Sequence, residues 1–128
     1  MIKVMHVLTD TNIGGAGVLL INRLSYTDMQ KYPTLVLVPK GSALCNRLSE
    51  IGVNFIEMDC VGDRSFDVMA IKAYKRIFRR IRPNIVNCHG CLSARIAAKL
   101  CRIPVKICTR HCVFPVKVRD KVMGAVNQ

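Results

Sequence analysis

The stretch that decides the fold is residues 2–17, Ile2-Lys-Val-Met-His-Val-Leu-Thr-Asp-Thr-Asn-Ile-Gly-Gly-Ala-Gly17. Its first part, which ends at Leu8, is an apolar run of the length of a buried strand. The loop from Thr9 to Gly15 carries glycines, and an amphipathic pattern from Ala16 to about Thr27 predicts a helix. Glycines between a strand and a helix let the backbone approach a ligand closely.

The same alternation of apolar strand and amphipathic helix continues along the chain about five times. The remaining expected strands are 34–38, 53–58, 84–88 and 104–109, and the remaining expected helices are 42–51, 66–82 and 91–102, with a helical start after Lys117. The helix over 66–82 has apolar residues at the three-or-four spacing of a core-facing stripe, namely Phe66, Ala70, Ala73, Ile77, Phe78 and Ile81. The pattern predicts an α/β, three-layer Rossmann-like domain, with a mainly parallel sheet of about five strands and helices on both faces.

Composition indicates one domain and an acidic partner. The chain has 128 residues, of which 51% are hydrophobic, so we expect a single compact domain over 1–128. Its formal charge of +12 predicts attraction to nucleotide phosphates, to an anionic membrane surface or to nucleic acid. Aromatic residues make up only 5% and Trp is absent, which argues against nucleic acid as the partner.

The seven cysteines indicate a reducing compartment. The apolar N-terminal run is too short for a signal peptide, and no run approaches the length that spans a bilayer. We therefore expect reduced thiols and a cytoplasmic location, with a peripheral contact at the inner membrane face as an additional expectation.

Three loops are expected at the carboxyl ends of the strands, where parallel sheets bind ligands: 9–15, 89–90 and 110–115. In the first loop the glycines read Gly14-Gly15-Ala-Gly17 rather than G-x-G-x-x-G, and no acidic residue ends the second strand. A nicotinamide cofactor is therefore not expected. A loop that binds an anion and a tight turn that merely needs glycine both fit this segment.

Two histidines, His89 and His111, follow the fourth and fifth strands. At the ligand edge an imidazole can hydrogen-bond sugar hydroxyls or exchange a proton near neutral pH. A structural role is the alternative for each.

The cysteines pose a separate question, because Cys88-His-Gly-Cys91 and Cys108-Thr-Arg-His-Cys112 could converge on a zinc ion if their strands are adjacent. Cys88 and Cys108 lie inside apolar runs, however, where thiols usually act as small core residues. We predict no metal site.

A row of cations lies along the expected helix over 66–82, on the side away from its apolar stripe. It consists of Lys72, Lys75, Arg76, Arg79 and Arg80. A solvated helix face and a surface that rests on anionic lipid head groups are both consistent with it.

Taken together, the sequence resembles the group 1 glycosyltransferases of GT-B architecture over nearly its whole length. The resemblance rests on five segments in order, which are Lys3-Val-Met-His-Val-Leu8, Ile13-Gly-Gly-Ala-Gly-Val-Leu-Leu-Ile-Asn22, Lys40-Gly-Ser-Ala-Leu-Cys-Asn-Arg-Leu48 with Ile51-Gly-Val53, Arg82-Pro-Asn-Ile-Val-Asn-Cys-His89, and Ile103-Pro-Val-Lys-Ile-Cys-Thr-Arg-His111. It implies the N-terminal, acceptor-side half of such an enzyme.

The resemblance implies transfer of a hexose from a nucleoside diphosphate sugar, generally with retention and without a cofactor or catalytic metal. It implies that Gly14 and Gly15 face the donor phosphates and the acceptor, and that His111 contacts the donor sugar near the reacting carbon, so that His111 is the expected catalytic residue. His89 would line the same cleft, and we place Asn12 and Arg110 of the neighbouring loops with the substrate-binding residues. The expected acceptor is a cell-envelope glycan or a lipid-linked molecule.

The sequence departs from that family in one large respect, because nothing up to Gln128 can supply the second Rossmann-like domain that holds the nucleotide. We therefore expect the chain alone to bind donor weakly and to be inactive without a C-terminal donor domain or a separate subunit. The rival interpretation is a non-catalytic α/β binding module that docks a membrane surface or an acidic partner.

Overall fold

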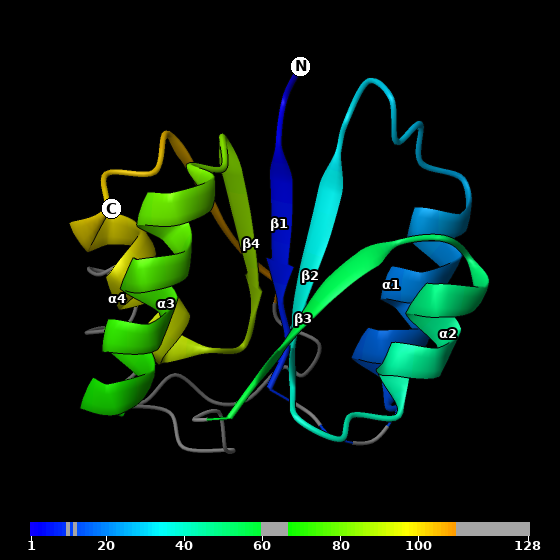
Figure 1. Cartoon of the computed structure of the whole chain (residues 1–128), viewed down its shortest axis with the longest axis horizontal. Coiled ribbons are helices and arrows are strands. Elements are labelled where there is room, and N and C mark those ends of the chain that lie inside the picture. The colour runs from blue at the N-terminus through cyan, green and yellow to red at the C-terminus, as the bar shows by residue number, and fades with distance from the viewer. Residues whose placement is uncertain (10, 12, 60–66, 110–128) are drawn as a thin grey trace.

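The computed structural model describes residues 1–9, 11, 13–59 and 67–109. Within them, strands and helices alternate throughout (Figure 1), in the order β1 (Val4–Val7), α1 (Gly15–Ser25), β2 (Thr34–Pro39), α2 (Leu44–Glu50), β3 (Asn54–Met58), α3 (Val68–Ile81), β4 (Ile85–His89), α4 (Leu92–Leu100) and β5 (Val105–Thr109). Each lies where the sequence places it, with ends that differ by one or two residues. The helix expected after Lys117 lies outside the described residues.

The five strands form one parallel sheet in the order β3-β2-β1-β4-β5. Strand β1 lies in the middle, where Val4 is opposite Thr34 of β2 on one side and Ile85 of β4 on the other. Strands β2 and β3 thus add successively to one side of β1. The chain then crosses back to β1, and β4 and β5 add to its other side. This topology confirms the predicted Rossmann-like fold.

The sheet is the middle of three layers, with α1 and α2 on one face and α3 and α4 on the other (Figure 1). Each helical layer has its own buried cluster against the sheet. Leu44 and Leu48 of α2 are fully buried on the first face, and Tyr74 and Phe78 of α3 are buried on the second. Burial of each such side chain contributes about 1.5–3 kcal/mol, so both layers are held mainly by apolar packing.

Helix α3 shows how far the predicted apolar stripe was right. Ala70 and Phe78 are buried as expected, and Ala73, Ile77 and Ile81 pack at the edge of the core. The centre of the buried face is instead formed by Ile71 and Tyr74. Phe66 lies outside the described residues.

Three of the four described helices, α2, α3 and α4, are followed by a residue with left-handed backbone. Gly52 has a φ of 74° after α2, a conformation that glycine adopts readily at the end of a helix. Arg82 after α3 and Arg102 after α4 have φ values of 53° and 54°. For a residue with a side chain this conformation costs roughly 1–2 kcal/mol, so an arginine at these positions requires an explanation other than backbone preference.

Candidate functional site

The candidate site lies at the carboxyl edge of the sheet, where the strand order reverses between β1 and β4. The chain leaves β1 toward α1 on one face and leaves β4 toward α4 on the other (Figure 1). In sheets of this type, ligands bind between the two diverging loops. Of the three loops expected to matter, the ones after β1 and after β4 therefore flank the reversal point.

The loop after β1 ends at a helix N-terminus without a side-chain cap. Gly14 is the N-cap of α1, it makes no side-chain cap hydrogen bond, and the first turn contains no acidic residue. A Cβ atom added to Gly15 would meet nothing within 4 Å, so packing does not require glycine there. The positive end of the α1 dipole at Gly14 and Gly15 is thus suited to an anion, and contact of these glycines with a donor stays a prediction.

Gly17, the third glycine of the same run, has a different role. A Cβ atom on Gly17 would lie 3.0 Å from Cδ2 of Leu44, so the absence of a side chain lets α1 pack closely on α2. The glycine-rich segment therefore divides into an open part at residues 14 and 15 and a packing part at residue 17. Of the two alternatives left open by the sequence, the structural one applies to Gly17, and the ligand-loop one stays a prediction for Gly14 and Gly15.

A pair of histidines joins β1 to β4 at the reversal point. Nδ1 of His6 lies 3.2 Å from Nε2 of His89, and the rings are tilted with centroids 5.4 Å apart. One imidazole must donate and the other accept, so the pair shares one proton when both rings are neutral. The sequence pointed to His89 but not to His6, which is 83 residues away from it.

Burial determines the charge state of His6. Its side chain is 6% exposed, and desolvation, followed by the nearby His89 and Arg23, lowers its pKa from 6.5 to about 4. His6 is therefore neutral at physiological pH. A neutral buried imidazole can hold the ring of the half-buried His89 in one orientation, which suits His89 for contact with a polar ligand at the edge of the sheet.

Asn87 and Thr109 extend this polar row toward β5. Asn87 is the β4 residue opposite His6, it is 4% exposed, and its Oδ1 accepts a hydrogen bond of 2.8 Å from Oγ1 of Thr109. Because side chains alternate along a strand, Asn87 and His89 lie on the same face of the sheet as His6. Asn87 is a second residue that sequence reasoning missed. The available signal was a polar residue at matching positions of two otherwise apolar strands.

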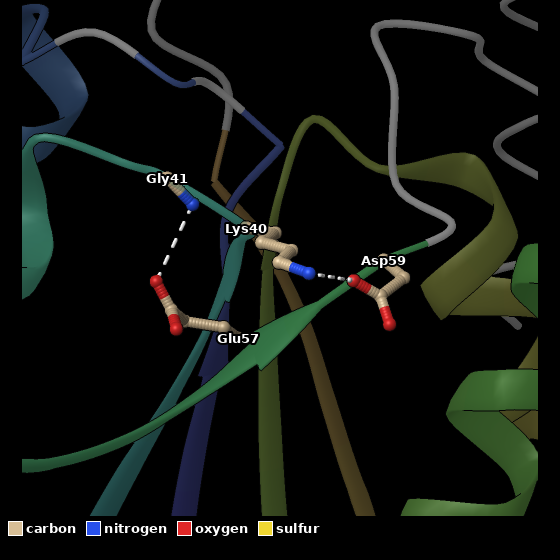
Figure 2. A network of polar contacts seen from close by, with 4 residues as sticks. All are labelled: Lys40, Gly41, Glu57 and Asp59. Carbon is tan, nitrogen blue, oxygen red and sulfur yellow. Dashed lines mark hydrogen bonds and ion pairs between the residues drawn. The ribbon is translucent and has the colours of Figure 1, made fainter.

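The end of β2 contributes a different kind of contact (Figure 2). Lys40 Nζ lies 3.5 Å from Oδ1 of Asp59, and the Gly41 amide donates to Oε1 of Glu57 at 3.3 Å. Both ends of the ion pair are largely exposed, so it adds little stability. One lysine faces two carboxylates at this end of the sheet, so the region around α1 and β4 is the part of the edge better suited to an anion.

The cysteines of β4 and α4 are core residues. Cys88 and Cys91 are 2% and 3% exposed, and Cys91 Sγ lies 3.7 Å from the Tyr74 hydroxyl. Desolvation raises the pKa of both thiols, so they stay protonated. In the described part of the chain no group of three or more His, Cys, Asp or Glu side chains could hold a metal ion. Cys112 and His111 lie outside that part.

The cations of α3 point away from the core, as predicted. Lys72, Arg76, Arg79 and Arg80 are exposed and Lys75 is half-buried. A shallow groove of about 340 Å³ is lined by Lys72, Lys75, Arg76 and Arg79. Of the helices that the structure describes, none is both long and apolar enough to cross a membrane.

Three of the predicted site residues, Asn12, Arg110 and His111, lie outside the described residues, and their roles stay predictions. The structure brings Gly14, Gly15 and His89 to the same edge of the sheet and adds His6 as the partner of His89.

Comparison with solved structures agrees with this fold. A glycosyltransferase from Rickettsia africae matches 94% of this chain with a TM-score of 0.68 and 17% identity. A UDP-GlcNAc 2-epimerase from Neisseria meningitidis, bound to UDP-GlcNAc, matches 81% with a TM-score of 0.56 and 16% identity. The Streptomyces glycosyltransferase SsfS6, in complex with thymidine diphosphate, matches 99% with a TM-score of 0.56 and 10% identity.

The matched regions are only part of those proteins. The chain covers 32%, 30% and 42% of the three structures, in the order given above. No curated protein sequence matches this chain significantly. The family model described as "Glycosyl transferase 4-like" matches residues 8–121, which include both loops of the candidate site. The chain belongs to the glycosyl transferase 4-like family and has the Rossmann-like fold of a GT-B glycosyltransferase domain.

Proposed function

We propose that this chain is the N-terminal, acceptor-side half of a GT-B glycosyltransferase that transfers a hexose from a nucleoside diphosphate sugar with retention. The observation that carries the proposal is the N-terminus of α1 at Gly14 and Gly15, which has no side-chain cap, at the same edge of the sheet as the His6–His89 pair. The N-terminal end of α1 would face the donor phosphates, and His89 would contact a sugar hydroxyl.

Similar structures support a nucleotide-bearing ligand. The Neisseria epimerase is bound to UDP-GlcNAc and SsfS6 is complexed with thymidine diphosphate. We extend that chemistry to this chain, with His111 as the proposed catalytic residue and with Asn12 and Arg110 as further substrate contacts. A cell-envelope glycan or a lipid-linked molecule is the proposed acceptor.

A second domain is part of the proposal, because the chain covers about a third of the Rickettsia glycosyltransferase. A C-terminal donor domain, on the same or another polypeptide, would supply most of the contacts to the nucleotide. The 128-residue chain alone would therefore bind donor weakly and turn over no substrate. Sustained multiple turnover by this chain alone would contradict that expectation.

Amide NMR of the ¹⁵N-labelled chain tests the donor site. Titration with UDP- and TDP-sugars at millimolar concentration should shift the amides of Gly14, Gly15, His89 and Gly90 and leave the opposite edge of the sheet unchanged. If no donor shifts any of these amides, the proposed contact of this half with the donor is wrong.

A matched pair of variants at Gly15 sharpens the test. Gly15→Asp and Gly15→Asn add side chains of nearly equal shape where a Cβ atom meets nothing, so neither should disturb the fold. Only the aspartate places a negative charge at the helix N-terminus, where it would repel donor phosphates. We expect Gly15→Asp to weaken donor binding clearly more than Gly15→Asn, and equal effects would argue against an anion at this helix end.

A second candidate function, docking to an anionic membrane surface, is favoured by the exposed cations of α3. Each Lys or Arg near such a surface contributes about 1 kcal/mol, so Lys75→Glu, Arg76→Glu and Arg79→Glu together should weaken vesicle binding on the order of a hundredfold. Reversal of Lys3, Lys31 and Lys40 changes the net charge equally and is the control. If both triple variants lose vesicle binding equally, the effect comes from overall charge and not from the α3 surface. If the α3 variant binds vesicles as the unmodified chain does, the docking function is wrong.

A further inference from the structure

A second cationic feature lies at the amino edge of the sheet, opposite the candidate donor site. There, a hollow of about 480 Å³ opens where α3 and α4 end and where β4 and β5 begin. Three arginines line it, Arg79, Arg82 and Arg102, and the buried Phe78 and Ile103 contribute to its apolar wall. None of these residues belongs to the loops around Gly14 or His89.

The backbone at two of the three arginines does not favour arginine. Arg82 and Arg102 both have left-handed backbone, with φ values of 53° and 54°, and both follow the end of a helix. At the end of α2 the corresponding left-handed residue is Gly52, which adopts this conformation without cost. Among the described residues, both arginines with left-handed backbone line the same hollow. The side chains, rather than the backbone, therefore account for these residues.

Among the described residues, no carboxylate compensates the charge of the hollow. None of the residues that line it is acidic, and both ion pairs in the described part of the chain lie in the other half of the molecule, between residues 40 and 59. The C-terminal ends of α3 and α4 each carry about half a negative charge. Against three guanidinium groups these two half charges leave a clear positive excess.

Asn84 adds a neutral donor to the same lining. Its Oδ1 accepts a hydrogen bond of 2.9 Å from the backbone amide of Lys3, which leaves the NH₂ group as the donor side of the amide. Guanidinium groups bind phosphate oxygens in pairs, and an amide NH₂ can donate to a remaining oxygen. The volume exceeds what a phosphate alone needs, so an ester group fits beside it.

We propose that this hollow is a binding site for a phosphate monoester, held by Arg79, Arg82 and Arg102. The same chemistry occurs in a soluble sugar or glycerol phosphate and in the head group of phosphatidic acid. The site is independent of the proposed donor site, since the two lie at opposite edges of the sheet and share no residue.

Mapping on the unmodified 128-residue chain is the first test. We expect glycerol 3-phosphate to shift the amides of Arg82, Asn84 and Arg102 in a saturable way, whereas glycerol at the same concentration and chloride at the same ionic strength should not. Shifts spread along the outer face of α3, or no shifts near the hollow, would overturn the proposal.

The left-handed backbone allows an informative variant. Arg82→Gly with Arg102→Gly removes both side chains while relieving the backbone, so the fold should be kept. We expect at least about a tenfold loss of glycerol 3-phosphate affinity for each arginine removed. Lys31→Ala with Lys40→Ala removes the same charge outside both the hollow and the cationic row of α3, and should bind normally. Equal losses in the two double variants would overturn the proposal.

Vesicles distinguish the two sources of the phosphate. If the natural ligand is a lipid, binding to vesicles that contain phosphatidic acid should fall in the double glycine variant and stay unchanged with phosphatidylcholine alone. If the ligand is soluble, the double glycine variant should lose glycerol 3-phosphate binding and keep any vesicle binding. Both results support the site, and retention of both kinds of binding would overturn it.

Discussion

The two halves of the sheet are built alike but differ in charge. Residues 1–59, which form β1 to β3 with α1 and α2, contain five Lys or Arg and five Asp or Glu. Residues 67–109, which form β4 and β5 with α3 and α4, contain ten Lys or Arg and a single acidic residue, Asp67. Both ion pairs among the described residues lie in the first half. Nearly all of the net charge of the described chain therefore lies in residues 67–109, the cationic half. Residues 1–59 form the neutral half.

The N-termini of α1 and α3 also differ, because only α3 has a side-chain cap. Helix α3 is capped by Asp67, whose carboxylate accepts from the amides of Met69 at 2.9 Å and Ala70 at 3.4 Å. Helix α1 has Gly14 in the same role and no side-chain cap. Helix α1 thus has no side-chain cap at its N-terminus, whereas α3 is capped by a carboxylate. Helix α4, in the same half as α3, also lacks a side-chain cap at Cys91, so the contrast holds between α1 and α3. Helix-end amides and side-chain cations are thus two different ways in which this fold can attract phosphate.

The largest effect that we expect comes from the core of the cationic half. Tyr74 is fully buried, stacks on Phe78 with ring centroids 6.1 Å apart, and its hydroxyl contacts Cys91. Tyr74→Ala should lower the free energy of unfolding by about 3–5 kcal/mol, measured by urea denaturation. Tyr26 is 93% exposed, so Tyr26→Ala in the neutral half is the control and should change stability by less than about 0.5 kcal/mol. Similar losses in both variants would contradict the described packing.

The next effect concerns the histidine contact that joins the halves. The pKa of His6 is lowered to about 4 in the folded chain and returns to about 6.5 on unfolding, so the unfolded chain binds the proton first as pH falls. Stability is fully present above pH 6.5 and should decrease by about 3 kcal/mol as pH falls to 4. Denaturant titrations across this range should show a smaller decrease for His6→Gln. An unchanged pH dependence in that variant would mean that His6 is not the group responsible.

The third effect compares two glycines of the neutral half. Gly17→Val would push side-chain atoms against Leu44 and should destabilise the fold by about 1–3 kcal/mol. Gly15→Val adds the same side chain where a Cβ atom meets nothing, and should change stability by less than about 1 kcal/mol while blocking access to the α1 N-terminus. Thermal unfolding of the pair checks the difference, and an equal cost at both positions would contradict the division of the glycine run.

The smallest effect comes from exchanging the two helix caps. Asp67→Ala removes the cap of α3 and should cost about 1 kcal/mol of unfolding free energy. Gly14→Asp supplies a cap to α1 and should raise stability by a few tenths of a kcal/mol while abolishing donor-induced amide shifts at Gly15. If the Gly14→Asp chain still binds nucleotide sugar with full affinity, the N-terminus of α1 is not a donor site that a side-chain cap can block.

Much of the fold was predictable from local patterns. Apolar runs such as Thr34–Val38 and the amphipathic stripe before Pro83 correspond to β2 and α3 almost residue for residue. The carboxyl edge as the place of Gly14, Gly15 and His89 also followed, since parallel strands end at one edge. Local signals suffice here because strand and helix periods, glycine stops and proline breaks act within a few residues.

Other features depended on which strands are neighbours. In the sequence, His6 is a lone polar residue in an apolar run, and nothing local relates it to a residue 83 positions later. Likewise, Arg82 and Arg102 are two ordinary surface arginines until the ends of α3 and α4 meet at one hollow.

Strand and helix order, the parallel sheet and its ligand edge are therefore determined by the sequence alone, because apolar periodicity and turn chemistry specify them locally. The His6–His89 pair, the packing role of Gly17 and the arginine-lined hollow were decided only by the tertiary structure. The physical reason is the strand order, which returns the chain to the side of β1 after β3 and so brings β4 and its helices against residues that are remote along the chain.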